Sequence, residues 1–251
     1  MSDTFIAQRL AAGEANALGQ LHGLPLPQWQ PCPQPQPVVL QGQYCRLEPL
    51  SVARHGEALY AAMQRDVEGA NWTYLPYGPF ADQASYRQWL SSMEGLADPQ
   101  FYAIVDAGSG QALGLASYLR IDPANGVIEV GHLNFSPLLQ RTPAATEAMY
   151  LLMRHAFELG YRRYEWKCNA LNLPSRRAAE RLGFLFEGLF RQAMISKGRN
   201  RDTAWYSILD GEWPMVRQLL EQWLSADNFD AAGQQRQSLT ALMTNWRQTR
   251  Q

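Results

Sequence analysis

The sequence predicts an α/β fold in which a mixed sheet is flanked by helices. Two observations lead to this prediction. Apolar residues recur at helical spacing in several stretches, and β-rich segments separated by short Gly-, Pro- and Asp-containing turns lie between those stretches. In the second half of the chain the order strand, helix, strand is typical of a parallel crossover. A chain of 251 residues can bury a sizeable core as one large domain or two small ones.

Residues 1–37 are expected to form an arm before the main domain. Residues 25–37 alternate Pro with polar residues, and because Pro removes a donor and fixes φ, this stretch suits an extended linker. The preceding residues show only a loose helical pattern, formed by Phe5, Ile6, Leu10, Ala17 and Leu18. We expect the arm to pack on the domain surface, with a separate module as the alternative.

The main domain is expected to begin with a strand at residues 38–50 and a helix capped by Ser51. The apolar face of this helix carries Leu59, Ala62 and Met63. Asp82 is expected to cap a second helix, whose apolar residues at i, i+3, i+4 and i+7 are Tyr86, Trp89, Leu90 and Met93. This apolar face needs a sheet to cover it.

Three strands are expected next, at residues 101–106, 112–121 and 126–137. The turns AGSGQ and DPANG between them predict an antiparallel meander. A helix over residues 143–159 follows and ends at Gly160. Its apolar stripe consists of Ala145, Met149, Leu152, Met153 and Ala156, and its polar face is expected to carry Glu147, Arg154 and Glu158.

The last strands and helices complete the predicted sheet and its cover. A strand at 161–170 precedes a short helix with Pro174 in its first turn and Gly183 after its end. The later elements are strands at 185–195 and 203–209, the basic loop 196–202 that joins them, and a helix at 213–224. The tail has helical spacing at Leu239, Leu242, Met243 and Trp246, which favours a helix laid on the parent domain over a partner-binding element.

These patterns divide the chain into three parts. They are an N-terminal arm with a Pro-rich linker (1–37), a main domain (38–226) and a C-terminal helical tail (227–251). No internal repeat is present.

Composition excludes several classes of function. The 22 basic and 23 acidic side chains leave a formal charge of −1, so neither nucleic acid nor a membrane surface is an expected partner. No stretch approaches the roughly 20 apolar residues of a membrane span, and the first residues do not resemble a signal peptide, which favours a cytoplasmic location. The scattered Cys32, Cys45 and Cys168 form neither a disulfide framework nor a zinc pattern, so no metal is expected.

The junction at residues 136–149 is the first candidate for chemistry. A strand runs directly into a helix N-terminus there, and free backbone N–H groups with the helix dipole favour an anion. Thr142 can cap this helix, while the small Ala144 and Ala145 would let a phosphate approach. An ordinary capped helix start is the alternative.

About thirty residues downstream lies the motif N-x-x-S-R-R-A-A-E-R-L-G-F, from Asn172 to Phe184. Together with the junction it resembles the GNAT superfamily of N-acetyltransferases, in particular the RimJ/RimL-like branch, over roughly residues 38–224. The resemblance implies a GNAT fold, with a mixed, mostly antiparallel sheet of about seven strands in which strands four and five splay apart. It also implies acetyl-CoA as cosubstrate, with acetyl transfer to a primary amine by direct attack in a ternary complex.

The same resemblance assigns residues to the cofactor. Gln140 and Ala145 match the first and last positions of the family's Q-x-x-G-x-G/A cradle for the CoA pyrophosphate, while Pro143 replaces the central Gly and lacks an N–H. The remaining cradle donors are Arg141, Thr142, Ala144 and Ala145. Contacts to pantetheine are expected from Leu133, Asn134 and Phe135 of a bulged strand and from Asn172. Arg176, Arg177 and Arg181 are candidates for the 3′-phosphate, the first two being favoured, and a solvated helix face is the alternative.

Two residues are candidates for proton transfer. Glu129 matches a family Glu on the fourth strand and would take the amine proton through water, whereas strand glutamates more often pair with Arg. Ser175 would reprotonate the CoA thiolate, or it merely caps its helix. The Tyr acid of many relatives is absent, since Ala179 stands at that position.

The acceptor side is expected to include His132, which is also the second candidate base. An aromatic loop would form the wall of the acceptor site through Trp72, Tyr74, Tyr77 and Phe80, unless these rings form a buried cluster. The acceptor is a protein N-terminus or a small-molecule amine, and the protein a monomer or homodimer. Pro143 and Ala179 keep open a non-catalytic acyl-CoA-binding or protein-interaction role.

Overall fold

The structure, a computed structural model, describes residues 12–248. The chain divides into two compact units, Met1–Pro31 and Cys32–Gln251. In the first unit, strands β1 (Gly13–Ala15) and β2 (Leu21–Gly23) form an antiparallel hairpin.

The expected helical pattern is wrong at Ala17 and Leu18, which lie in the turn of this hairpin. The turn is fixed by Asn16, whose side-chain oxygen accepts from the Leu18 and Gln20 amides, and by Gly19, whose φ is +76°. Phe5, Ile6 and Leu10 lie outside the described residues.

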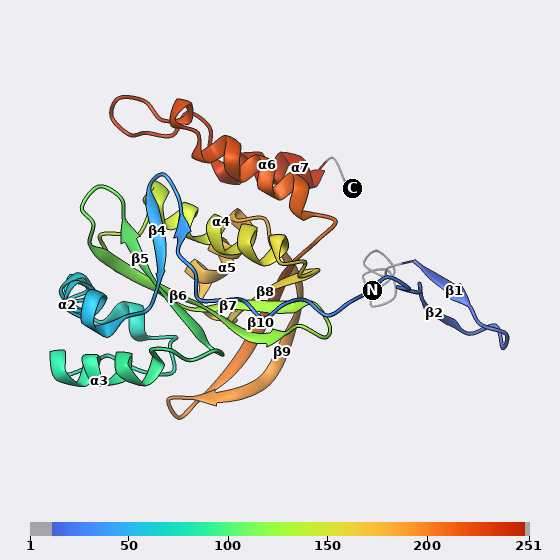
Figure 1. The fold of residues 1–251 in the computed structure, drawn as a ribbon, viewed down its shortest axis with the longest axis horizontal. Coiled ribbons are helices and arrows are strands. Elements are labelled where there is room, and N and C mark those ends of the chain that lie inside the picture. Colours follow the sequence, from blue (N-terminus) through green and yellow to red (C-terminus); the bar gives the residue numbers. More distant parts are fainter. Residues whose placement is uncertain (1–11, 249–251) are drawn as a thin grey trace. The chain divides into compact units, whose positions relative to one another are not determined.

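The second unit contains an eight-stranded sheet with the order β3-β4-β5-β6-β7-β8-β10-β9 (Figure 1). All neighbours are antiparallel except β7 and β8, which are parallel. The strands are β3 (Leu40–Gln41), β4 (Cys45–Pro49), β5 (Gln100–Asp106), β6 (Ala112–Asp122), β7 (Val127–Phe135), β8 (Arg163–Asn169), β9 (Leu185–Ser196) and β10 (Arg199–Leu209). The predicted mixed, mostly antiparallel sheet is confirmed, with one strand more because the opening segment forms the hairpin β3–β4.

Helices cover both faces of the sheet, as Figure 1 shows. They are α2 (Val52–Met63), α3 (Gln83–Met93), α4 (Pro143–Glu158), α5 (Leu173–Arg181), α6 (Trp213–Leu224) and α7 (Leu239–Gln248), with short 3₁₀ turns η1 (Ala70–Trp72) and η2 (Ala226–Asn228). Asp82 caps α3 as predicted, since its side chain accepts from the Ser85 amide in a capping box. The expected tail helix is present as α7, which packs against α5 and α6 and buries Leu239 and Met243.

The Pro-rich segment crosses the boundary between the two units. Its last residues run extended along the second unit, where the Cys32 amide donates to Pro123 O and Tyr161 Oη donates to Pro33 O. Gln100 Nε2 likewise donates to Pro35 O. Pro has no N–H to donate to a neighbouring strand, but its carbonyl still accepts. The Tyr161 and Gln100 side chains therefore hold the segment without a sheet ladder.

One predicted surface residue of α4 is buried. Glu147 was expected on the polar face, but its side chain accepts from the backbone amides of Gln43, Tyr44 and Cys45 at 2.6–2.8 Å, and the residue is only 6% exposed. Three donors replace the water that this carboxylate loses. The carboxylate thereby fixes the loop between β3 and β4 on α4.

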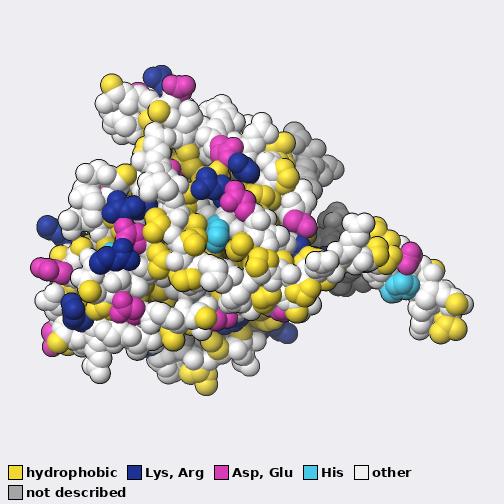
Figure 2. Space-filling model, viewed as in Figure 1, with side chains coloured by type: hydrophobic (Ala, Val, Ile, Leu, Met, Phe, Trp, Pro, Cys, Tyr) yellow, Lys and Arg dark blue, Asp and Glu magenta, His cyan; other side chains and the backbone are white. Residues whose placement is uncertain are grey.

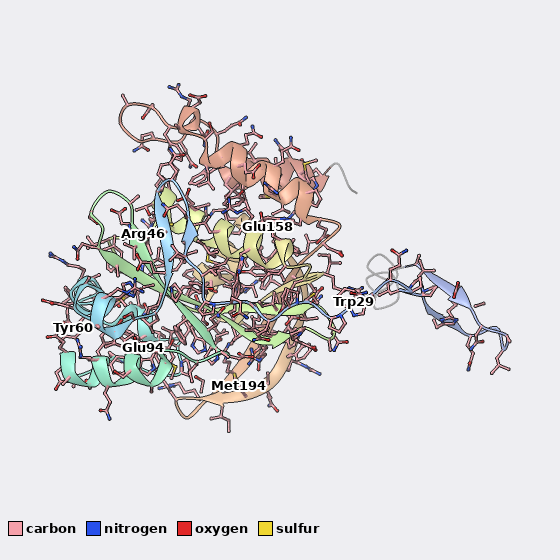
Figure 3. All side chains as sticks on the ribbon, in the orientation of Figure 1. Trp29, Arg46, Tyr60, Glu94, Glu158 and Met194 are labelled. Atoms are coloured by element: carbon pink, nitrogen blue, oxygen red, sulfur yellow. The ribbon has the colours of Figure 1, made fainter. Side chains whose placement is uncertain are left out.

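The β9–β10 hairpin is longer than expected, and the predicted loop 196–202 is wrong. The connection is only Lys197–Gly198, whose φ angles are 49° and 71°, as a two-residue turn with positive φ at both positions requires. Residues 199–202 therefore belong to β10. Figure 3 labels Met194 near the end of this hairpin, and Figure 2 shows basic and acidic side chains intermixed on one face of the molecule.

Candidate active site

The central parallel pair of strands separates halfway along its length. β7 and β8 are paired from Val127–Arg163 to Val130–Trp166 and no further, although both strands continue. A β-bulge marks the separation: Ser117 of β6 pairs with Gly131 and Leu115 pairs with Asn134, so Ala116 alone stands opposite His132 and Leu133. The predicted splay of the two strands is thus confirmed.

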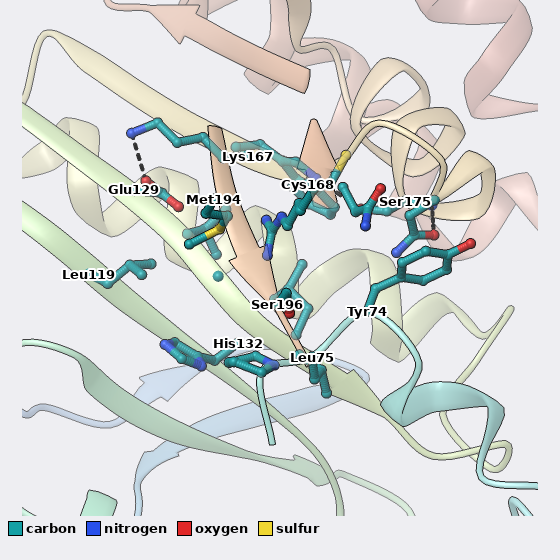
Figure 4. A pocket seen from close by; sticks show the side chains of 18 of the residues that line it. Tyr74, Leu75, Leu119, Glu129, His132, Lys167, Cys168, Ser175, Met194 and Ser196 are labelled. Atoms are coloured by element: carbon teal, nitrogen blue, oxygen red, sulfur yellow. Dashed lines mark hydrogen bonds and ion pairs between the residues drawn. The ribbon is translucent and has the colours of Figure 1, made fainter. Parts of the chain in front are cut away.

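A cavity of about 350 Å³ opens at this separation (Figure 4). Its lining comes from the aromatic loop, β6, β7, β8, the start of α5 and the tip of the β9–β10 hairpin. Among the lining residues are Tyr74, Arg120, Glu129, His132, Leu133, Lys167, Cys168, Asn172, Ser175, Lys197 and Arg201. Figure 4 shows Glu129 and Lys167 joined at one side of the cavity, with Tyr74 and Ser175 at the other.

Glu129 is buried in this wall and held by two cations. Arg120 Nη1 donates to both of its oxygens, at 2.8 and 2.7 Å, and Lys167 Nζ lies 2.8 Å from Oε2. Glu165, the residue opposite Glu129 on β8, shares the same lysine at 2.7 Å. The expected alternative, that this strand glutamate pairs with an arginine, is therefore a feature of the structure.

His132 is neutral in this environment. Burial, and the nearby Arg120 charge, lower the pKa of His132 to about 4. Tyr77 Oη lies 3.0 Å from its Nδ1, and the two rings stack at 9°. If the tyrosine hydroxyl donates, Nε2 must carry the ring proton, so His132 offers a donor in place of a base.

The aromatic loop is divided between the cavity and the core. Tyr74 lines the cavity, and its hydroxyl donates to Leu171 O at 3.3 Å. Trp72 is buried in a hydrophobic cluster with Phe80 and Tyr86, away from the cavity lining. Tyr77 contacts the site only through His132, and burial raises its pKa. The buried-cluster interpretation therefore holds for Trp72 and Phe80.

Ser175 is available for more than helix capping. The N-cap of α5 is Asn172, whose Oδ1 accepts from the Ser175 amide at 3.1 Å, so the expectation that Ser175 caps the helix is wrong. The Ser175 hydroxyl accepts from Trp166 Nε1 at 3.1 Å and can still donate. Its neighbour Cys168 is buried, and burial raises the pKa of that thiol.

The predicted anion cradle lies at the start of α4. Thr142 is the N-cap, and its Oγ1 accepts from the Ala145 amide at 3.2 Å and donates to Leu139 O. Because Pro143 at the first position has no N–H, Ala144 supplies the unsatisfied amide of that turn. Arg141, with φ of 63°, is exposed beside it.

The Gln140 side chain is hydrogen-bonded to the aromatic loop. Its Nε2 donates to Asn71 Oδ1 and Phe135 O, at 2.9 and 2.8 Å, so it joins the aromatic loop to the end of β7. Asn134 beside it is 2% exposed, and neither atom of its amide finds a partner among the described residues.

A second cavity of about 410 Å³ adjoins the cradle. It is lined by Arg141, Thr142, Ala145 and Thr146 of the α4 start, by Arg181, and by tail residues including Gln234, Gln235 and Ser238. These amides, hydroxyls and two guanidinium groups fit a phosphate-bearing ligand. Arg176 instead contacts Ala170 O and Tyr206 Oη, and Arg177 is exposed.

Sequence reasoning missed the cations of the first cavity: Arg120, Lys167, Lys197 and Arg201. The basic loop 196–202 was the only signal, and its role was read as a connection. Backbone geometry marks the same places, because four of the five non-glycine residues with positive φ in residues 12–248 lie at the two cavities: Arg120, His132, Arg141 and Lys197. Such strain is concentrated at functional sites.

In residues 12–248 no helix is long and apolar enough to cross a membrane. Nor does that part of the chain place three or more His, Cys, Asp or Glu side chains where they could hold a metal ion.

The sequence and the fold are similar to those of known proteins. The profile of the GNAT acetyltransferase domain matches residues 45–185. A crystal structure of a GCN5-related N-acetyltransferase from Brucella melitensis has a TM-score of 0.85 and 49% identity, covering 87% of this chain and 100% of its own. The chain is 30% identical to the ribosomal-protein-serine acetyltransferase of Escherichia coli over 41% of this chain and 58% of that protein. It is 26% identical to the Bacillus subtilis protein named "Putative ribosomal N-acetyltransferase YdaF", over 66% and 90%.

Proposed function

The chain belongs to the GNAT family of acetyltransferases, in its RimJ/RimL-like branch, and from this premise we propose that it transfers an acetyl group from acetyl-CoA to a primary amine. The single observation that carries the proposal is the separation of β7 and β8 at a bulge, with a cavity between them and a second cavity at the start of α4. Acetyl-CoA supplies the acetyl group as a thioester.

The residues of both cavities fit this cosubstrate. The Arg141 and Arg181 guanidinium groups, which line the second cavity, would hold its phosphates together with the Ala144 amide in the first turn of α4. The backbone of Leu133 to Phe135 and the Asn172 side chain would bind the pantetheine arm. A backbone N–H of the bulge would stabilise negative charge that develops on the carbonyl oxygen.

The chain's own groups then handle the protons. Glu129 would receive the amine proton through a water molecule, and Arg120 and Lys167 hold that carboxylate in position. The Ser175 hydroxyl, fixed by Trp166, would donate to the departing thiolate. No covalent enzyme intermediate is required, since amine and thioester meet in one cavity.

Two acceptor classes remain within the proposal. The names of two relatives refer to ribosomal proteins, which supports a protein amino terminus. The cavity of about 350 Å³ equally suits a small amine.

The first test is thermal unfolding with and without acetyl-CoA, followed by thiol release with a panel of amines. A ligand at 100 times its Kd adds about 2.7 kcal/mol and raises Tm. A rise in Tm with amine-dependent thiol release supports the enzyme. A rise in Tm with no amine-dependent release over the whole panel would support the acyl-CoA-binding alternative, and no rise would refute both.

A further inference from the structure

The acceptor cavity holds an excess of positive charge. Its lining includes four cationic side chains, Arg120, Lys167, Lys197 and Arg201. Glu129 is the single acidic residue among the described residues that line it, and that carboxylate is already bonded by Arg120 and Lys167. The other two, Lys197 and Arg201, therefore form no salt bridge with an acidic residue of the cavity, and Glu129 acts on Arg201 only as a nearby charge.

Arg201 is the less satisfied of the two. It lies on β10 with its side chain half-buried, and within residues 12–248 its Nε is buried without a hydrogen-bond partner. No ion pair involving Arg201 occurs in that part of the chain, and burial lowers its pKa. A guanidinium in this state costs stability unless a ligand supplies the missing acceptor.

Lys197 binds only neutral groups. Its Nζ donates to the carbonyl oxygens of Trp72 and Gly78, both at 2.7 Å, so it ties the hairpin tip to the aromatic loop while keeping its full charge. Most of the lysine side chain is exposed, but its ammonium group is partly desolvated at the cavity, which lowers its pKa. A ligand in this cavity lies near both Lys197 and Arg201, because both line it.

The phosphates of the cosubstrate do not account for these cations. The cradle at the start of α4 lines a different cavity, with its own Arg141 and Arg181, and no residue lines both cavities. The reacting end of acetyl-CoA, which the proposed function places between β7 and β8, is uncharged. The anion that Arg201 requires must come from the acceptor.

The same charges act on the attacking nitrogen. An ammonium in a cavity with this excess of positive charge is disfavoured relative to the neutral amine, so the cavity helps deprotonate the nucleophile but weakens its binding. An anionic group on the same molecule restores the attraction and can take a paired contact from a guanidinium. One molecule that carries both groups satisfies the amine chemistry and the unpaired cations together.

Resting on the proposed function, we infer that the acceptor is a primary amine that carries a carboxylate or phosphate, and that Arg201 binds this anion. The transfer forms the N–C bond to the acetyl carbon and breaks its C–S bond. The amine gives up one proton, and CoA leaves as the thiol.

The test compares amines that differ only in charge. Thiol release from acetyl-CoA is measured for free amino acids against their carboxamides, for O-phosphoethanolamine against ethanolamine, and for hexapeptides with acidic or neutral side chains near the amino terminus. We expect kcat/KM to be at least tenfold higher for the anionic member of the preferred pair. Which pair responds identifies the source of the anion: an amino acid, a phosphorylated amine or an acidic peptide.

The variant Arg201→Gln should lower kcat/KM for the anionic member at least tenfold and leave the uncharged member within threefold. Arg199→Gln, on the same strand but outside the cavity lining, is the matched control and should change neither. Equal rates within every pair, faster reaction of the uncharged members, or equal loss for both members in Arg201→Gln would overturn the inference. A rise in Tm with acetyl-CoA in each variant shows that the cosubstrate site is intact. If the Tm of the wild type does not rise with acetyl-CoA, the proposed function itself is wrong.

Discussion

The two ends of the candidate site provide positive potential in different ways. The cradle at the start of α4 depends mainly on backbone amides and the helix dipole, with Thr142 arranging the first turn. The acceptor cavity depends on side chains, since Arg120, Lys167 and Arg201 come from three different strands. A backbone cradle suits a cosubstrate that the whole family shares, whereas side-chain cations can be exchanged one at a time to suit an acceptor.

The largest expected effect concerns the acid that the two cavity cations share. Glu129→Gln removes the proton acceptor, and we expect kcat to fall about 10³-fold, within the range of a lost general base. Because Arg120 loses its anionic partner and Lys167 keeps only Glu165, KM for an anionic acceptor should not rise. Steady-state thiol release at saturating acetyl-CoA measures both quantities.

Glu158→Gln serves as the control for this experiment. Its side chain is 55% exposed on α4, so kcat should stay within twofold of the wild type. A Glu129→Gln enzyme with wild-type kcat would show that water alone accepts the proton, and Glu129 would then only position the two cations.

The two regions differ in their sensitivity to pH. The acceptor cavity contains His132, whereas residues 141–146 of the cradle contain no histidine. The pKa of His132 is about 4 in the folded state and near 6.5 in the unfolded chain. Between these values the unfolded chain binds a proton that the folded state does not, so stability falls as the pH drops from about 6.5 to about 4. We expect His132 to account for about 2 kcal/mol of this loss at pH 4, after discounting for its partial exposure.

Urea unfolding of the wild type and His132→Gln at several pH values checks this expectation. The variant should lose less stability than the wild type on acidification, while His22→Gln, at an exposed position on β2, should follow the wild type. Parallel curves for the wild type and His132→Gln would mean that His132 titrates alike in both states.

The fold was predictable where neighbouring residues determine local structure. The Asp82 cap, the spacing of apolar residues in α3 and the turns of the β5–β6–β7 meander are contained in short segments, and the structure has them. Glu147 was not predictable in this way, since its three amide donors lie about 100 residues away. The Lys197–Gly198 turn was missed because the charged residues after it resemble a loop, although they pair with β9.

The same distinction applies to the site. The cradle is a contiguous segment, so Thr142 and Pro143 could be placed at the start of α4 from the sequence. Arg201 could not be assigned, because only the sheet order β8-β10-β9 brings the hairpin tip to the cavity. A single arginine in a basic segment carries no sign of which face of its strand it occupies.

A smaller effect is expected at Ser175, which lines the acceptor cavity. Ser175→Ala should lower kcat about tenfold, since water can replace the hydroxyl as donor to a good leaving group. The α5 cap is kept, because it uses Asn172 and only the backbone of Ser175, but stability should fall by about 1 kcal/mol because the buried Trp166 Nε1 loses its acceptor. Burst-phase kinetics would show whether the lost rate lies in chemistry, and an unchanged kcat would remove Ser175 from the mechanism.

The smallest effect tests the cradle at its departure from the family pattern. Pro143→Gly restores one N–H at the first position of α4, and one added donor to a phosphate should lower the Kd of acetyl-CoA about threefold. The freed backbone should cost about 1 kcal/mol of stability. Pro214→Gly, in the first turn of α6, carries the same backbone change away from the cradle. Calorimetric titration of both variants with acetyl-CoA measures Kd, and thermal unfolding measures stability. We expect lower stability in both variants and a lower Kd only in Pro143→Gly. An unchanged Kd would mean that the Ala144 amide and the neighbouring guanidinium groups already satisfy the phosphates, and that Pro143 costs this cradle no affinity.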